Sequence, residues 1–188
     1  MLGKIVVGIK GVCPLLMNQL TPENYEASKK GKGKKGSKQD TSSPEHKQKE
    51  FEQAQYRTEA GQLCQPAEHL EKCLEIAGGS FKFEGQKKYG KVLCGGIIID
   101  PEQIVHKIQT VVPMEKFVRI PPRTGAKVLK TRAKLPEWEL EFVITVINES
   151  INFDVLKDIV TYAGTYVGIG DWRPKYGRFE VVKFEKAA

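Results

Sequence analysis

The chain has 188 residues, of which 30 are Lys or Arg and 23 are Asp or Glu, so its formal net charge is +7. Its hydrophobic content of 40% is too high for a chain that is disordered throughout. No apolar run approaches the roughly 18 residues of a membrane span, and the opening stretch MLGKIVVGIKG lacks the features of a secretory signal. We therefore expect a soluble, cytoplasmic protein with one domain over residues 1–188 and no contact with a membrane.

The four cysteines are far apart and form no Cys-x-x-Cys pair, so neither a zinc site nor a dense disulfide scaffold is indicated. Cys64, Cys73 and Cys94 have no sequence neighbours that would activate a thiolate, and we expect them to pack in the interior. The metalloprotease, serine hydrolase and P-loop motifs are absent. We expect no metal and no cofactor.

The positive charge is concentrated in two short segments. Residues 28–50 contain eight lysines and three acids, and residues 119–134 contain six basic residues and no acid. The other 149 residues therefore carry a net charge of −4. A uniformly solvated surface would intersperse the two signs, whereas clustering of one sign indicates a polyanionic partner.

The segment at residues 28–50 is predicted to be a flexible insertion after the first strand. It is rich in Gly, Ser and Lys and has nothing with which to build a core. Two roles remain open, a solubilising linker and a contact for nucleic acid, and the eight lysines favour the second. The candidate contacts here are Lys29, Lys30, Lys32, Lys34 and Lys35.

In chain order, residues 4–10 predict a strand because they are short and β-branched. Residues 46–57 have the composition of a short polar helix. Residues 65–78 predict a clearer helix, whose apolar positions share one face. Residues 91–100 predict a buried strand with a bulge at the Gly95-Gly96 pair.

Two strand-like runs within residues 115–136 predict a long, protruding basic hairpin around an Arg-Thr-Gly turn. Such a hairpin would present its cations together to a polyanion. The candidate contacts here are Arg119, Arg123, Lys127, Lys130 and Arg132.

Residues 138–147 form the clearest strand, because apolar and polar residues alternate along them. Asn152 is predicted to cap a helix over residues 153–163 that Gly164 ends, and residues 179–184 predict the last strand. Without the insertion and the hairpin, the order is β-α-β-β-α-β. The sequence therefore predicts an α+β fold with a ferredoxin-like, RRM-like core, an inserted basic loop and a protruding basic β-hairpin.

A glycine-rich segment at residues 167–181 holds the densest cluster of chemically useful side chains. Glycines let another backbone approach closely, aromatic rings stack on bases and cations meet phosphates. The alternative is a structural turn whose aromatic rings fill the core. A Rossmann loop would open a helix after a strand, whereas this segment follows a helix and enters a strand. The candidate contacts are Gly168, Gly170, Trp172, Arg173, Lys175 and Arg178.

This segment and the element order resemble the RAMP superfamily, the RNA-binding proteins of antiviral CRISPR systems, which include the backbone subunits that polymerise along guide RNA. Gly168-Ile-Gly170 and Gly177-Arg-Phe-Glu-Val match its glycine-rich loop between the second helix and the last strand. The basic hairpin is similar to the thumb of a backbone subunit, and the opening strand followed by Cys13-Pro-Leu-Leu-Met-Asn is similar to a RAMP first strand. The string GIGDWRP…GRF also resembles uncharacterised phage and prophage proteins.

The resemblance implies non-catalytic binding of single-stranded nucleic acid by a repeating subunit of a homo-oligomer or of a larger ribonucleoprotein complex. RNA is favoured by the analogy, and single-stranded DNA fits the charges and aromatic residues equally well. One alternative is a phage-like assembly or interaction protein that docks an acidic protein surface. Another is a metal-independent endoribonuclease.

The sequence does not predict an enzyme. His46 lies in the polar insertion and His106 in an irregular stretch, which leaves His69 as the best candidate for the general base of the nuclease alternative. No second histidine or tyrosine is paired with His69 at a recognisable spacing. General acid–base catalysis needs a positioned group, so we expect His69 to be a solvent-facing helix residue.

Overall fold

The computed structural model describes residues 3–20, 43–120, 123 and 125–187. Its centre is an antiparallel four-stranded sheet in the order β4-β8-β1-β9. These strands are β1 (Gly3–Gly11), β4 (Ile97–Asp100), β8 (Glu139–Val146) and β9 (Phe179–Lys186). The predicted α+β class and the predicted first, central and last strands are confirmed.

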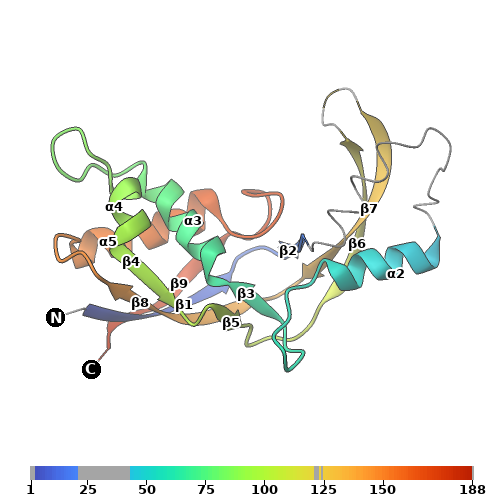
Figure 1. Cartoon of the computed structure of the whole chain (residues 1–188), viewed down its shortest axis with the longest axis horizontal. Helices are drawn as coiled ribbons and strands as arrows, with labels where there is room; N and C mark the ends of the chain where they lie inside the picture. Colours follow the sequence, from blue (N-terminus) through green and yellow to red (C-terminus); the bar gives the residue numbers. More distant parts are fainter. Residues whose placement is uncertain (1–2, 21–42, 121–122, 124, 188) are drawn as a thin grey trace.

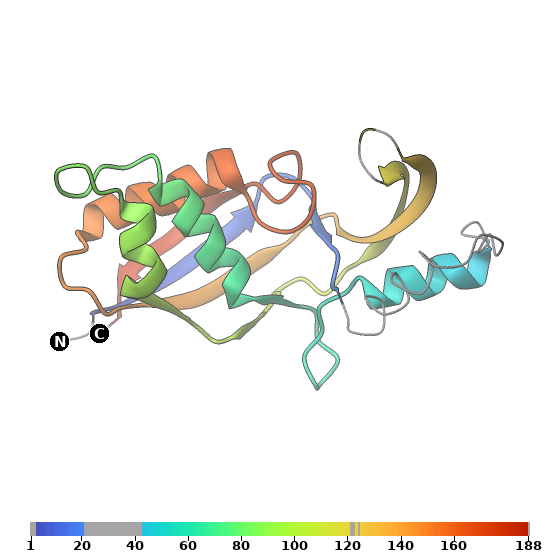
Figure 2. The ribbon, with the colours of Figure 1, turned by 45° about the horizontal axis from the view of Figure 1, so that its top comes forward.

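Three α-helices cover one face of this sheet (Figure 2). They are α3 (Ala67–Gly78), α4 (Tyr89–Gly96) and α5 (Phe153–Tyr162), and α5 runs on into the π-helical turn η1 (Ala163–Val167). The core lies between the two layers, where β8 contributes Leu140, Phe142 and Ile144, each at most 2% exposed. The residues that alternate with them form the helix-free face.

The strand predicted over residues 91–100 is wrong in its first half, which belongs to helix α4. A short apolar run does not by itself distinguish a buried strand from a buried helix. Packing decides here, because Gly78 of α3 lies against Gly90 of α4, and a Cβ on Gly78 would come 2.8 Å from the Gly90 nitrogen. The expected bulge at Gly95-Gly96 is therefore the last turn of a helix.

Helix α5 begins as predicted, with the Asn152 side chain accepting hydrogen bonds of 2.9 and 3.1 Å from two N–H groups of the first turn. The predicted helix over residues 153–163 is confirmed to within one residue, but Gly164 does not terminate the helical chain, which continues through η1 as far as Gly168, whose φ is 73°. Gly164 serves packing instead, since the Phe179 carbonyl oxygen and ring occupy the space of a Cβ. This contact fixes the end of the helical layer against the start of β9.

A second sheet carries the predicted hairpin away from the helical layer (Figure 1). Its strands are β2 (Leu15–Met17), β7 (Ala126–Leu135) and β6 (Val112–Ile120), in the order β2-β7-β6. The hairpin is confirmed, whereas β2 was not predicted. A third pair, β3 (Cys64–Pro66) with β5 (Gln103–Val105), was also missed. Strands of three residues are too short to show an alternating pattern.

Helix α2 (Pro44–Gln53) lies beside the hairpin. The Ser43 hydroxyl caps it by accepting a 3.2 Å hydrogen bond from the His46 N–H, and Pro44 occupies the first turn. The polar helix predicted over residues 46–57 is confirmed, although it starts and ends earlier than predicted.

Candidate nucleic-acid interface

The register of β6 against β7 divides the predicted basic residues of the hairpin between two faces. Residues directly opposite each other in an antiparallel pair project from the same face. Lys116 is opposite Lys130, whereas Arg119 is opposite Lys127 on the other face. We call Lys116, Lys130 and Arg132 the inner face, and Phe117, Arg119 and Lys127 the outer face. The candidate residues of the hairpin therefore do not form one continuous surface.

The glycine-rich loop, residues 168–178, depends on its glycines for its shape. Gly168, Gly170 and Gly177 all have positive φ, between 73° and 79°, a region that side chains rarely adopt. A Cβ on Gly177 would overlap the Ile169 carbonyl oxygen. The Asp171 N–H donates a 2.9 Å hydrogen bond to the Leu16 carbonyl oxygen of β2, and the Gly177 N–H donates one of 2.9 Å to the Pro14 carbonyl oxygen just before β2. Gly168 and Gly170, two candidate contacts, thus have a structural reason to be glycine.

The inner face of the hairpin meets the glycine-rich loop at a polar junction. Arg132 Nε lies 2.9 Å from Asp171 Oδ2, and Asp171 Oδ1 accepts a 3.0 Å hydrogen bond from the Trp172 N–H. The Lys116 ammonium lies over the Trp172 ring, 4.9 Å from its centroid. Trp172 is half-buried at this junction and lies outside the hydrophobic core. The alternative in which Trp172 fills the core is therefore wrong.

Two of the candidate cations are neutralised within the chain. Arg132 is paired with Asp171, and Lys130 forms an ion pair with Glu50 of α2. Glu50 also accepts a 2.9 Å hydrogen bond from the Thr131 N–H. Burial by itself would raise the pKa of Glu50, but the bonds from Lys130 and Thr131 outweigh it and lower that pKa. Lys130 and Arg132 therefore brace the hairpin against α2 and the loop.

The remaining candidate cations are exposed. Arg119, Arg123 and Lys127 lie toward the hairpin tip, and Arg173 and Lys175 lie in the glycine-rich loop. Arg178 is also exposed but lines a groove beside β9, so it is not part of the junction. The lysines Lys29, Lys30, Lys32, Lys34 and Lys35 lie outside the described residues.

Lys116 is a residue of the junction that the sequence analysis missed. It precedes the basic run that begins at Arg119, and its exposure and its contact with Trp172 depend on the hairpin register. The strand register could have identified Lys116. Once the turn is placed, Lys116 is opposite Lys130 and therefore projects from the same face of the hairpin.

A small cavity of about 130 Å³ adjoins the junction, and His69 and Tyr56 line it together with Asp171. The Gln65 side chain contacts His69 Nδ1, and the Tyr56 ring meets the imidazole edge-on with centroids 5.2 Å apart. Burial, followed by the nearby charge of Arg173, lowers the pKa of His69. The expectation of a solvent-facing His69 is wrong, because folding places Tyr56 beside it from a segment distant in the sequence.

The surroundings of the other two histidines, His106 and His46, indicate structural roles. His106 is 1% exposed, and its ring lies edge-on to Trp138 with centroids 6.4 Å apart. Burial lowers the pKa of His106 to about 4. His46 Nε2 lies 3.5 Å from Glu50 Oε1, one turn further along α2.

Several other kinds of site are not found in the part of the chain that the structure describes. No group of three or more His, Cys, Asp or Glu side chains there is placed to hold a metal ion. Cys64 and Cys73 are buried, as expected, and burial raises the pKa of both thiols, that of Cys73 to about 12. The same expectation is wrong for Cys94, which is exposed on helix α4. Within the same residues, no helix has the length and apolar character needed to cross a membrane.

The helix-free face of the four-stranded sheet is polar. Lys107 Nζ lies 2.6 Å from Glu139 Oε1 and 3.4 Å from Glu141 Oε2, and Lys183 Nζ lies 3.8 Å from Glu141 Oε1. Within the described strands β1, β4, β8 and β9, the aromatic side chains belong to the core or pack against it. Stacking of bases on this sheet face, the mode of RRM domains, therefore has no aromatic platform here.

Comparisons with known proteins support the fold. No protein-family model and no curated protein matches the chain. The chain is similar to one in the cryo-EM structure of the Type III-B Cmr-beta bound to cognate target RNA, with a TM-score of 0.64 and 12% sequence identity. The match covers 98% of this chain and 60% of that chain, so this chain spans about three fifths of its length. At this identity the similarity shows that the two chains share a fold and nothing more.

Proposed function

We propose that the protein binds single-stranded nucleic acid without cleaving it, as a cytoplasmic subunit of an oligomer or of a ribonucleoprotein complex. The observation that carries the proposal is the junction where the Lys116 ammonium lies over the half-buried Trp172 ring. Arg173 and Lys175 are exposed and follow Trp172 directly in the same loop. A half-exposed aromatic ring beside cations is the arrangement that stacks an unpaired base and holds its phosphates.

The preference for a single strand follows from the same geometry. A base must be unstacked to reach the Trp172 ring, which a duplex does not permit without loss of its own stacking. RNA is proposed as the strand because the structural neighbour is described as bound to target RNA. The exposed Arg119, Arg123 and Lys127 of the hairpin would add phosphate contacts that do not depend on the sequence of bases.

A titration of fluorescently labelled single-stranded RNA, single-stranded DNA and duplex RNA of matched sequence tests this function. We expect both single strands to bind more tightly than the duplex. The logarithm of the binding constant should fall linearly with the logarithm of the salt concentration. Absence of binding to all three at low salt would overturn the proposal and favour the alternative of a protein-interaction subunit.

A second candidate function is metal-independent cleavage of RNA, which the surroundings of His69 favour. Gln65, 1% exposed, contacts its ring in the manner of an orienting residue, and Tyr56 lies beside it. With the Gln65 amide turned so that its oxygen accepts from Nδ1–H, His69 Nε2 would take the proton of a ribose 2′-hydroxyl as that oxygen bonds to the adjacent phosphorus. The bond to the 5′-oxygen would break, and that oxygen would take the Tyr56 hydroxyl proton, leaving a cyclic phosphate and a 5′-hydroxyl.

Incubation of labelled RNA with the protein in EDTA, followed by a denaturing gel, tests this candidate. Cleavage by the native chain that His69→Ala abolishes and His46→Ala preserves would support it. Intact RNA, or equal cleavage by the native chain and the His69→Ala variant, would refute it and leave binding as the function.

A further inference from the structure

Strand β9 has one edge without a strand partner among the described residues. It is an outer strand of the four-stranded sheet and pairs with β1 on its other side. In the part of the chain that the structure describes, no backbone hydrogen bond joins residues 180–185 to any segment other than β1. An outer strand of this kind offers alternate N–H and C=O groups to another extended chain.

A groove of about 520 Å³ lies along this edge, between β9 and the helix that packs over it. Its strand wall includes every residue from 179 to 184. Because successive side chains of a strand point to opposite faces of the sheet, a wall that includes both sets is formed by the edge of the strand itself. A partner in the groove would therefore reach the unpaired backbone groups of β9.

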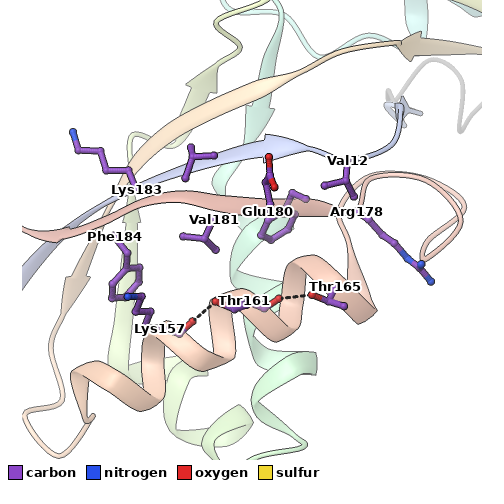
Figure 3. A pocket seen from close by; sticks show the side chains of 11 residues that line it. Val12, Lys157, Thr161, Thr165, Arg178, Glu180, Val181, Lys183 and Phe184 are labelled. Carbon is purple, nitrogen blue, oxygen red and sulfur yellow. Dashed lines mark hydrogen bonds between the residues drawn. The ribbon is translucent and has the colours of Figure 1, made fainter.

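The helical wall of the groove leaves those backbone groups available. Thr161 and Thr165 line it, and their hydroxyls each donate a 3.0 Å hydrogen bond to a carbonyl oxygen one turn earlier in the helix. Figure 3 shows Val181 and Phe184 pointing from β9 toward α5. The space between strand and helix is thus lined by small or apolar side chains, which suits the apolar side chains of an added strand.

The charges of the groove favour an acidic occupant. The charged residues that line it are three cations and one acid, namely Lys157, Arg178, Lys183 and Glu180. Lys183 Nζ lies 3.8 Å from Glu141 Oε1 on the helix-free face. Lys157 and Arg178 are exposed and have no ion pair within the described residues. Lys157 lies beside Phe184, whereas Arg178 lies near the start of β9, so these two cations are at opposite ends of the groove (Figure 3).

We propose that the β9 groove binds an extended, acidic segment of another protein, which pairs with β9 as an additional strand. Backbone hydrogen bonds to β9 would supply affinity, and acidic side chains near the two ends of the segment would meet Lys157 and Arg178. Apolar side chains between them would cover Val12 and Val182, which are 60% and 52% exposed beside the groove. That burial would offset the cost of ordering the segment.

This surface is distinct from the proposed nucleic-acid interface. The groove shares no lining residue with the junction at Trp172 and Lys116. The inference therefore adds a protein partner to the proposed function and does not depend on it.

Fluorescence anisotropy with a labelled peptide of about eight residues, long enough to span residues 179–184, tests the proposal. The peptide carries two glutamates at each end and alternating valine and threonine between them. The native chain should bind it and should not bind the version with lysines in place of the glutamates. Two further versions carry N-methyl groups on the odd or on the even residues. Because only alternate residues of an added strand donate to its neighbour, one version should bind and the other should not.

Two groove variants and one control locate the binding. Lys157→Glu should weaken peptide binding roughly fivefold or more, because it replaces an attraction by a repulsion. Thr161→Trp should abolish binding by filling the groove, and its melting temperature should stay near the native value because Thr161 is exposed. Lys91→Glu is the matched control, since Lys91 is exposed on α4 and does not line the groove. It should bind the peptide as the native chain does.

Three kinds of result would overturn the inference. One is absence of peptide binding, or equal binding by the native chain and both groove variants. Another is equal binding of the two N-methylated peptides. The third is a different occupant, shown by displacement of the peptide by single-stranded RNA, or by self-association of the native chain in sedimentation velocity that the peptide reverses. Binding of RNA by the Thr161→Trp variant, measured separately, would leave the proposed function standing in each case.

Discussion

At the scale of single residues, the backbone of Trp172 is the least ordinary feature of the junction. Its φ is 54°, a conformation that bulky residues rarely adopt. Asp171 holds it there by accepting from the Trp172 N–H while paired with Arg132. The ring lies outside the core, where it contacts the Tyr176 ring, with centroids 6.2 Å apart, and the Lys116 ammonium. Strain of this kind is typical of ligand sites, which agrees with a stacking role.

Trp172→Ala should weaken binding of single-stranded RNA by roughly 1–3 kcal/mol, the value of one stacked base. The melting temperature should change little, because the ring lies outside the core. Tyr166→Ala is the matched control, since Tyr166 is 62% exposed in η1 and is not among the proposed contacts, and it should bind almost as the native chain does. Equal losses in the two variants would contradict a specific stacking site at Trp172.

The buried His106 should make the fold sensitive to acid. Its pKa falls from 6.5 to about 4 on folding, so the unfolded chain binds the proton more readily than the folded chain. The stability that His106 contributes is present above pH 6.5 and is lost as the pH falls toward 4. Lowering the pH from 7 to 5 should therefore reduce the free energy of unfolding by about 2 kcal/mol through protonation of His106 in the unfolded chain.

Urea denaturation of the native chain and of His106→Leu at pH 7 and pH 5 measures this effect. The variant should lose about 2 kcal/mol less than the native chain between the two pH values. Equal losses would show that His106 is not responsible.

At the scale of elements, the hairpin is a braced arm and not a free basic ribbon. Its base is paired with β2, Lys130 is held by Glu50, and Arg132 is held by Asp171. Lys47 of α2 adds an ion pair of 2.9 Å with Glu115. Removal of Lys130 or Arg132 would leave Glu50 or Asp171 without its cationic partner and would destabilise the fold. A loss of binding in such a variant would therefore not distinguish lower stability from a lost nucleic-acid contact.

The exposed cations near the hairpin tip separate the two effects. Replacing Arg119, Arg123 and Lys127 with Ala removes three charges that no described carboxylate holds in an ion pair. The logarithm of the binding constant for single-stranded RNA falls with the logarithm of the salt concentration, at roughly 0.7 per phosphate contact. Loss of three contacts should make that slope shallower by about 2. The melting temperature should stay within a few degrees of the native value. An unchanged salt slope would place the nucleic acid elsewhere on the molecule.

Glycine substitutions test the helix that replaced a predicted strand. Gly95 in α4 has open space around its Cβ position, so Gly95→Ala should stabilise the chain by up to about 1 kcal/mol. A Cβ on Gly90 would meet the Glu75 carbonyl oxygen of α3, so Gly90→Ala should destabilise it by roughly 1–3 kcal/mol. Thermal unfolding of both variants measures the difference. Destabilisation by Gly95→Ala would argue against a helix there.

At the scale of the whole molecule, the helical layer and the hairpin divide the structure into two regions (Figure 1). The helices cover one sheet face, and the ion-paired opposite face lacks an aromatic platform. The proposed interface therefore lies where the glycine-rich loop meets the hairpin. That place also holds the cavity with His69, so binding and the alternative of cleavage would share one end of the molecule.

Much of the fold was predictable from local patterns. The alternation in β8 and the Asn152 cap of α5 are short-range features, and the structure confirms both. Helix α4 was not predictable, because only the contact between Gly78 and Gly90 shows why that apolar run is helical. The pairs that β2 and β3 form were not predictable either, since strands this short gain their hydrogen bonds from distant partners.

The sequence by itself determined the α+β class, the basic hairpin and the glycine-rich loop, because charge, period and glycine content are local properties. Only the tertiary structure decided which cations remain available. Lys130 and Arg132 meet Glu50 and Asp171 from distant segments, while Lys116 reaches Trp172. Ion pairs and ring contacts depend on distance in space, and the sequence alone does not specify that distance for residues far apart along the chain.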